Sequence, residues 1–134
     1  GCTADKETFK TDLLSAIEEY DRIGSMHVEK LHTPCGFDQI CFLDSDTILG
    51  TEGVPGSTPC IASTSPTPCV IVDAAYTDSK TNAFMSKQNT WEAIGWSEKI
   101  ETNATENYVC IKAKGSNFNI RFEGLGRKTR IVKQ

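Results

Sequence analysis

The sequence has 134 residues, of which 38% are apolar and 24% charged, a composition typical of one globular domain with a modest core. No apolar stretch is long enough to cross a bilayer as a helix. The net charge of −4 is unevenly spread, because residues 1–109 hold 7 Lys/Arg and 17 Asp/Glu, whereas residues 110–134 hold 7 and 1. A nucleic-acid-binding domain is basic overall, so this acidic domain argues against that class.

The basic C-terminal end has two other interpretations. It is either a solvated strand face beside the protein's own acidic surface or one half of a self-association contact. In the second case the basic end of one copy would meet the acidic surface of the next.

Residues of about 5–23 are predicted to form an amphipathic helix. Phe9, Leu13, Ile17 and Tyr20 recur at helical spacing, and Leu14, Ala16 and Ile23 extend the apolar stripe. Asp5 or Thr8 is the expected N-cap, and Gly24 is the expected stop. The apolar face of such a helix must be covered by a sheet or another helix.

Two strands are expected next, at 26–31 and 39–43, paired with each other across the turn residues Pro34-Cys35-Gly36. Residues of about 45–68 are mostly Ser, Thr, Gly and Pro, and are predicted to form a long loop. The apolar run 69–74 is predicted to be a buried strand, and the apolar pattern of 80–100 favours neither helix nor strand.

The C-terminal residues, about 107–133, are predicted to form an antiparallel meander. Phe118, Ile120 and Phe122 alternate with polar residues, which indicates a half-buried strand. The last strand, 127–133, is expected to be an edge strand that its Lys and Arg side chains protect. The fold class is therefore α+β: one domain over 1–134, in which a helix packs on an antiparallel sheet and disulfides staple the two.

Six cysteines without a metal-ligand or redox spacing indicate three disulfides and an oxidising compartment. Six cysteines allow fifteen pairings, and proximity in the sequence favours Cys35–Cys41, Cys60–Cys69 and Cys2–Cys110.

The cysteines have three alternative interpretations, namely a zinc site, a catalytic nucleophile and lipidation. The spacings do not suit zinc, and a nucleophilic cysteine would need His27 or His32 as its partner. Lipidation of Cys2 would leave one of the other five cysteines unpaired. We expect no catalytic, metal or cofactor site.

Other residues are candidate sites of modification or binding. Asn103-Ala104-Thr105 is a sequon for N-linked glycosylation in a secreted chain. Trp91 and Trp96 are either core anchors or a platform for a sugar or another ligand. Asp44, Asp46 and Glu52 could ligate calcium but lack the rest of a calcium-loop signature, so a solvated turn is the preferred interpretation.

Three segments carry a resemblance to a known group: residues 34–44, Cys110-Ile111-Lys112, and residues 121–126. Together they resemble the extracytoplasmic part of small uncharacterised archaeal proteins that one N-terminal hydrophobic helix anchors to the membrane. The order of elements is also similar to the globular part of type IV pilin-like subunits. Such subunits carry a hydrophobic N-terminal half-helix that this sequence lacks, so either it was trimmed or the pilin interpretation fails.

These patterns predict a non-enzymatic extracellular or cell-surface structural protein, in one version a pilin-like filament subunit. Its partners would be further copies, or a glycan, and contact with a membrane would depend on an N-terminal anchor. Because the chain begins with Gly, we expect a processed or trimmed form. The alternatives are a secreted carbohydrate- or ligand-binding module and a small secreted hydrolase with an unrecognised carboxylate pair.

Overall fold

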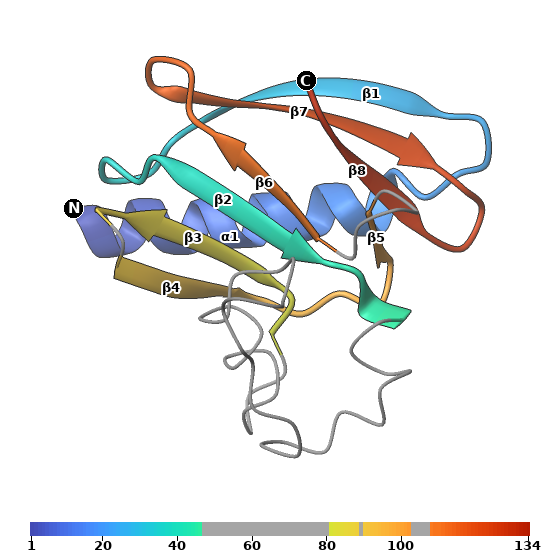
Figure 1. Cartoon of the computed structure of the whole chain (residues 1–134), viewed down its shortest axis with the longest axis horizontal. Helices are drawn as coiled ribbons and strands as arrows, with labels where there is room; N and C mark the ends of the chain where they lie inside the picture. Colours follow the sequence, from blue (N-terminus) through green and yellow to red (C-terminus); the bar gives the residue numbers. More distant parts are fainter. Residues whose placement is uncertain (47–80, 89, 103–107) are drawn as a thin grey trace, which may run out of the picture.

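The computed structural model describes residues 1–46, 81–88, 90–102 and 108–134 (Figure 1). One long helix, α1 (Cys2–Glu19), lies against two β-sheets, which confirms the predicted α+β class. Sheet A has the strand order β1-β7-β8-β5, and sheet B has the order β4-β3-β2-β6. The strands in chain order are β1 (Met26–His32), β2 (Gln39–Leu43), β3 (Ala83–Lys87), β4 (Thr90–Gly95), β5 (Ile100–Glu101), β6 (Tyr108–Lys112), β7 (Asn117–Gly124) and β8 (Thr129–Lys133).

Helix α1 forms where the apolar spacing predicted it, but its ends differ. Phe9, Leu13 and Ile17 are buried, as side chains four residues apart on one face should be. The helix begins at Cys2, earlier than predicted, and Gly1 occupies the N-cap position without a side-chain cap, so the predicted capping by Asp5 or Thr8 is wrong. It ends at Glu19, which leaves Ile23 in the following turn with 78% of its surface exposed.

Sheet A is built around β7, whose alternate residues Phe118, Ile120 and Phe122 are buried as predicted. β1 and β8 flank β7 in antiparallel pairing, and the two-residue β5 pairs with β8 in parallel. Because β8 lies between β7 and β5, the prediction that β8 would be an edge strand is wrong. The long edge strand of this sheet is β1.

The predicted pairing of the first two strands is also wrong, although both strands exist. β1 pairs with β7, whereas β2 pairs with β3 and β6 in sheet B. Between them the backbone takes left-handed conformations at Cys35 (φ 50°) and Gly36 (φ 77°). Such conformations redirect the chain sharply, and here β2 continues in the other sheet instead of folding back on β1.

The meander predicted over about 107–133 is wrong in its pairing: its three strands are present, but they are divided between the two sheets. β6 pairs with β2 in sheet B, and β7 and β8 form a hairpin in sheet A. Residues 80–100, whose pattern was ambiguous, supply β3, β4 and β5. The strand predicted at 69–74 and nearly all of the loop predicted at 45–68 lie outside the described residues.

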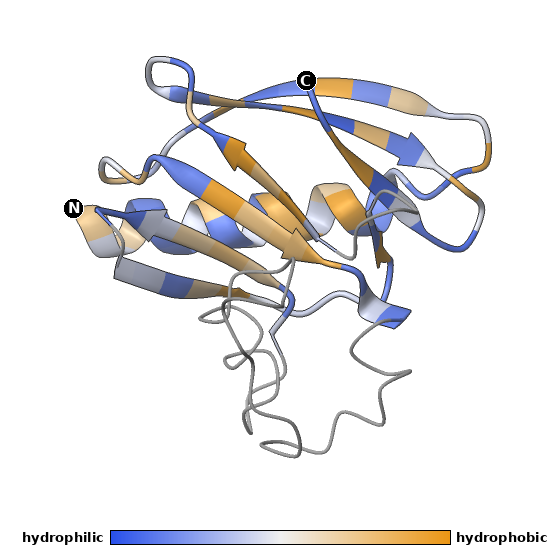
Figure 2. Ribbon diagram, viewed as in Figure 1, coloured by the Kyte–Doolittle hydropathy of each residue, from blue (hydrophilic) through white to orange (hydrophobic). Residues whose placement is uncertain are grey.

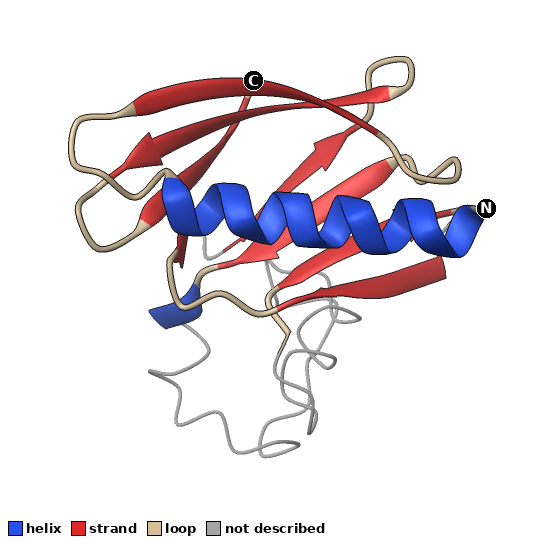
Figure 3. Ribbon diagram, turned by 180° about the vertical axis from the view of Figure 1, so that it is seen from behind, coloured by secondary structure: helices blue, strands red, loops and turns tan. Residues whose placement is uncertain are grey.

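The main core lies between α1 and the inner faces of both sheets. Viewed from behind, the helix crosses strands of both sheets (Figure 3). The apolar segments of the ribbon concentrate in these central strands (Figure 2). The largest fully buried side chains of this core are Leu13, Ile17, Ile40, Phe42, Met85, Ile100, Phe118, Ile120 and Phe122.

Candidate functional site

Sheet B is apolar on both faces, and the face turned away from α1 holds a second buried cluster whose half-buried aromatic side chains are a candidate binding site. Along β2, Ile40 and Phe42 belong to the main core, so Cys41 and Leu43 point to the other side. Cys41 lies opposite Phe84 in β3 and Cys110 in β6. We call this cluster the aromatic face. Its buried residues are Cys41, Leu43 and Phe84, and its half-buried residues are Trp91, Trp96, Tyr108 and Cys110.

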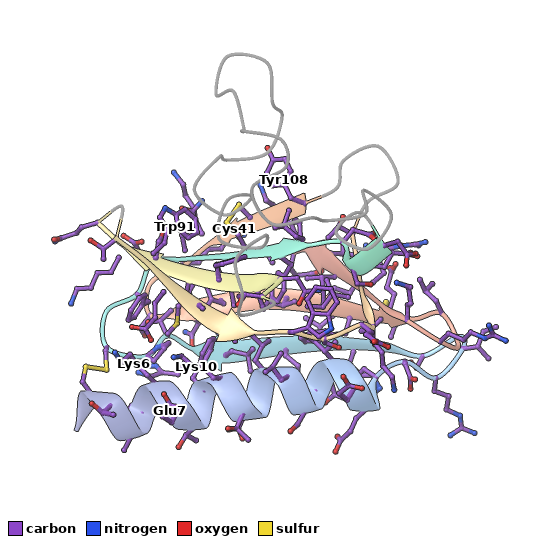
Figure 4. The ribbon with its side chains drawn as sticks, turned by 90° about the horizontal axis from the view of Figure 1, so that it is seen from below. Lys6, Glu7, Lys10, Cys41, Trp91 and Tyr108 are labelled. Carbon is purple, nitrogen blue, oxygen red and sulfur yellow. A yellow bond between two sulfur atoms is a disulfide. The ribbon has the colours of Figure 1, made fainter. Side chains whose placement is uncertain are left out.

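The two tryptophans predicted as anchors or as a platform both lie at this aromatic face. Trp91 and Trp96 are half-buried and pack against the buried cluster of Cys41, Leu43 and Phe84. Tyr108 joins them from β6, and Figure 4 shows Trp91, Cys41 and Tyr108 on the side of the sheet remote from the helix. Tyr108 was missed in the sequence, although it precedes Cys110 by two residues in one strand and therefore shares its face.

The structure revises the disulfide pairing. Cys2 pairs with Cys35, and Cys41 pairs with Cys110, so the predicted bonds Cys35–Cys41 and Cys2–Cys110 are wrong. An extended strand rises about 3.3 Å per residue, so β2 carries Cys41 away from Cys35 and places it directly opposite Cys110. The other predicted bond, Cys60–Cys69, lies outside the described residues.

The two observed disulfides have consequences for chemistry and compartment. Disulfide bonds indicate an oxidising, non-cytoplasmic environment. The sulfur atoms of Cys2 and Cys35 are bonded to each other, which leaves Cys2 no thiol for lipidation and Cys35 none for nucleophilic catalysis. Of the two histidines proposed as partners of a nucleophile, His27 instead stacks on Tyr20 with ring centroids 3.9 Å apart.

A second candidate surface is a basic cleft at the ends of β6 and β8. Its cavity has a volume of about 400 Å³. We define the basic cleft by the residues Lys112, Lys114 and Lys133 with Gln39 and Asn119. The three lysines are exposed, and no ion pair within the described parts of the chain engages them. Lysine and amide side chains around one cavity provide hydrogen-bond donors for an anionic group.

The other basic residues of the C-terminal third are mostly neutralised. Lys128 pairs with Asp46 at 3.0 Å. Arg130 reaches Glu101 at 3.1 Å, and Arg121 lies 3.1 Å from Glu123. The predicted solvated face beside acidic side chains therefore describes this part, whereas the basic cleft keeps its charge available.

Helix α1 carries the opposite charge on its outward side. This acidic helix surface consists of the exposed residues Asp5, Glu7, Asp12, Glu18 and Glu19. Lys10 lies 3.6 Å from Glu7, and Lys99 lies 3.3 Å from Glu18, so two of these charges are partly balanced. The others have no ion-pair partner among residues of the described ranges, so the surface is negative overall.

A cluster of partly buried, oppositely charged side chains joins α1 to β4. Glu92 accepts a hydrogen bond from Lys6 at 3.0 Å and pairs with Lys10 at 2.9 Å (Lys6 and Lys10 are labelled in Figure 4). The hydrogen bond from Lys10 lowers the pKa of Glu92 and outweighs burial, which acts in the opposite direction. Burial acts to lower the pKa of Lys10, but the bonds and charges of Glu92 and Glu7 raise it. This cluster ties α1 to β4.

The remaining predicted sites are placed as follows. Asp44 accepts hydrogen bonds from the backbone N–H groups of Asp46 at 2.9 Å and Thr102 at 3.3 Å. Ser45 between the two aspartates is buried, so this turn is packed against the fold and the expected solvated turn is wrong. No group of three or more His, Cys, Asp or Glu residues in the described ranges could hold a metal ion. Asn103, the sequon residue, lies outside those ranges, as does Glu52.

No protein-family model, curated protein or solved structure matches this chain. The helix that the structure describes is not long and apolar enough to cross a membrane.

Proposed function

We propose that this protein is a non-enzymatic structural subunit of an extracellular or cell-surface assembly. The most specific version of this proposal is that the assembly is a filament and the subunit has a pilin-like layout. The observation that carries the proposal is the separation of available charge into the basic cleft and the acidic helix surface. Contact between two different surfaces of one chain is heterologous, and it extends into an open filament when the rotation between copies does not close a ring.

Three further features support the extracellular placement. Two disulfides, which persist in oxidising compartments, join the start of α1 to the loop before β2, and β2 to β6. Asn103 is a glycosylation sequon. The resemblance to anchored archaeal extracytoplasmic domains fits the same compartment, with attachment to a membrane through an N-terminal anchor.

The filament version is tested by electron microscopy of the concentrated protein at low salt. We expect filaments from the wild type and none from K112E/K133E, because the substitutions reverse the charge of the basic cleft. The control R22E/R127E changes the net charge equally at two exposed arginines outside the cleft and should still assemble. A wild-type protein that forms no filaments, whether it is monomeric or dimeric, refutes the filament.

A complementary pair of variants tests which surfaces meet. D12K/E19K reverses the acidic helix surface, so it should not assemble alone. Mixed with K112E/K133E, it offers each reversed surface an opposite charge, and assembly should return. Failure of the mixture to assemble, with both variants folded, would show that the acidic helix surface is not the partner of the basic cleft.

The second candidate function is a secreted carbohydrate- or ligand-binding module. The observation that favours it is the gathering of Trp91, Trp96 and Tyr108 at one aromatic face. Aromatic rings offer flat apolar surface to the C–H faces of sugars. A glycan array should then give binding that W91A and W96A each abolish and that M26A, on sheet A, leaves unchanged. A blank array for the wild type would remove this candidate.

A further inference from the structure

β1 is an edge strand of sheet A with no strand on its outer side in the described part of the chain. It pairs with β7 over seven consecutive residues, from Met26 opposite Glu123 to His32 opposite Asn117, without a bulge. Figure 1 shows β1 at the outer margin of the sheet. A strand of this length presents a row of unpaired backbone groups, which is a template for pairing with another chain.

The hydrogen-bonding pattern of the β1–β7 pair shows which backbone groups of β1 remain unpaired. The backbone N–H of Gly124 donates to the carbonyl of Ser25 at 2.9 Å, and the N–H of Thr33 donates to the carbonyl of Ser116 at 2.9 Å. In an antiparallel pair only alternate residues bond the same neighbour, so the odd-numbered residues of β1 bond to β7. The N–H and C=O groups of Met26, Val28, Lys30 and His32 therefore point to the open edge.

The same four residues also expose their side chains. Leu31 packs on the core and His27 stacks on Tyr20, which places the odd-numbered side chains on the helix side. Met26 is 62% and Val28 is 55% exposed, and Ile23, just before the strand, is 78% exposed. The usual protections of an edge are weak here, since β1 has no proline and no bulge and carries one lysine.

We propose that β1 binds a second copy of this chain through antiparallel pairing of the two β1 strands, with the two-fold axis at Val28. The result is an isologous dimer in which the two A sheets form one continuous sheet. Backbone hydrogen bonds across the edge supply affinity, and the exposed Met26 and Val28 side chains become partly covered.

Charge complementarity selects this register. Three two-fold registers match the outward-pointing groups and pair at least five residues of β1, and they are centred on Val28, Glu29 or Lys30. A centre at Glu29 places two carboxylates face to face, and a centre at Lys30 does the same with two ammonium groups, both of which are unfavourable. A centre at Val28 places His27 opposite Glu29 of the second copy and joins two valines on the axis.

This contact does not depend on the proposed filament function. It uses β1, whereas the filament contact uses the basic cleft and α1, so each proposal can fail alone. In about 0.5 M salt the Debye length falls to about 4 Å, which suppresses a contact between exposed charges while leaving backbone pairing in place. Sedimentation equilibrium at this salt concentration therefore isolates the β1 dimer.

The decisive variant is Val28→Pro. Because the N–H of Val28 points to the open edge, proline removes it without breaking a bond to β7. Two hydrogen bonds at the axis are lost, and at about 1 kcal/mol each the dimer should dissociate about thirtyfold more readily. Val28→Thr keeps the N–H and the branched side chain, so it should dimerise like the wild type. Val28→Lys gives a second disruption at an exposed position and should also produce monomers.

The register has its own test. Glu29→Lys replaces the carboxylate opposite His27 with an ammonium group and should weaken the dimer, and H27E/E29K should restore it because it places a carboxylate opposite each new ammonium group. In the register centred on Glu29 the double variant would not restore it. The proposal is overturned if the wild type stays monomeric up to about 1 mM, the concentration of a very weak dimer. It is also overturned if V28P and V28K, folded by circular dichroism, dimerise as tightly as the wild type.

Discussion

Removing the Cys41–Cys110 disulfide should destabilise this protein more than removing Cys2–Cys35. Both changes are made with alanine, as C41A/C110A and C2A/C35A, so that no new hydroxyl is buried. Each variant loses a cross-link that limits the unfolded chain, and the free energy of unfolding falls accordingly.

The magnitudes follow from the sequence separations and from burial. In the chain-entropy model, the separation of 33 residues between Cys2 and Cys35 corresponds to about 3.8 kcal/mol, and that of 69 between Cys41 and Cys110 to about 4.4 kcal/mol. Cys41 is fully buried in the cluster of the aromatic face, so losing its sulfur adds about 1 kcal/mol of packing. C41A/C110A should therefore lose about 5 kcal/mol, roughly 1.5 kcal/mol more than C2A/C35A.

Urea unfolding followed by circular dichroism measures this difference. A domain of this size has about 5–15 kcal/mol of stability, so C41A/C110A should unfold at a much lower midpoint or be partly unfolded in buffer. If C41A/C110A loses less than about 2 kcal/mol, or less than C2A/C35A does, the assignment of the larger constraint to the β2–β6 bond is refuted.

Three further substitutions test the interior and its charges. Glu92→Gln should lower the free energy of unfolding by about 1 kcal/mol at pH 7. Because folding lowers the pKa of Glu92, this loss of stability relative to the wild type should be present above the unfolded pKa near 4.5 and vanish as the pH falls through the folded pKa. Unfolding midpoints measured over a pH series would reveal or contradict this dependence. Gly124→Ala should destabilise strongly, since a Cβ there would overlap the carbonyl oxygen of Arg22, whereas Gly1→Ala, with open space around it, should melt like the wild type; equal melting temperatures would disprove the overlap. Thr129→Val removes the buried hydrogen bond of 2.6 Å from the threonine hydroxyl to the carbonyl of Ile17 and should cost about 1–3 kcal/mol in urea unfolding, so an unchanged midpoint would mean that another donor replaces it.

Local patterns in the sequence were sufficient for the elements that bury one face. Burial of one face sets the spacing of apolar residues in these elements. It gives the four-residue spacing of Phe9, Leu13 and Ile17 in the helix and the alternation of Phe118 and Ile120 in the strand. Element boundaries were less predictable, because α1 starts without a side-chain cap to mark it.

Strand partners and disulfides could not be read from proximity. The chain leaves sheet A through a left-handed backbone at Cys35, a non-glycine residue in which no sequence signal marks that conformation. Pairing Cys35 with its neighbour Cys41 then failed, because extended β2 separates Cys41 from Cys35 and aligns it with Cys110. Tryptophans drew attention to the aromatic face, but the contribution of Tyr108 depends on β6 lying beside β2.

The bond between Cys2 and Cys35 also determines how this fold would respond to mechanical tension. A pull applied at Cys2 passes through the sulfur atoms directly to Cys35, so the residues between them, including all of α1 and β1, carry none of it. The helix cannot be peeled from the sheets from that end, and the first structure under load is β2, which is itself bonded to β6. Stretching between Cys2 and the end of β8 would therefore leave the β1 edge intact until the sheets themselves give way.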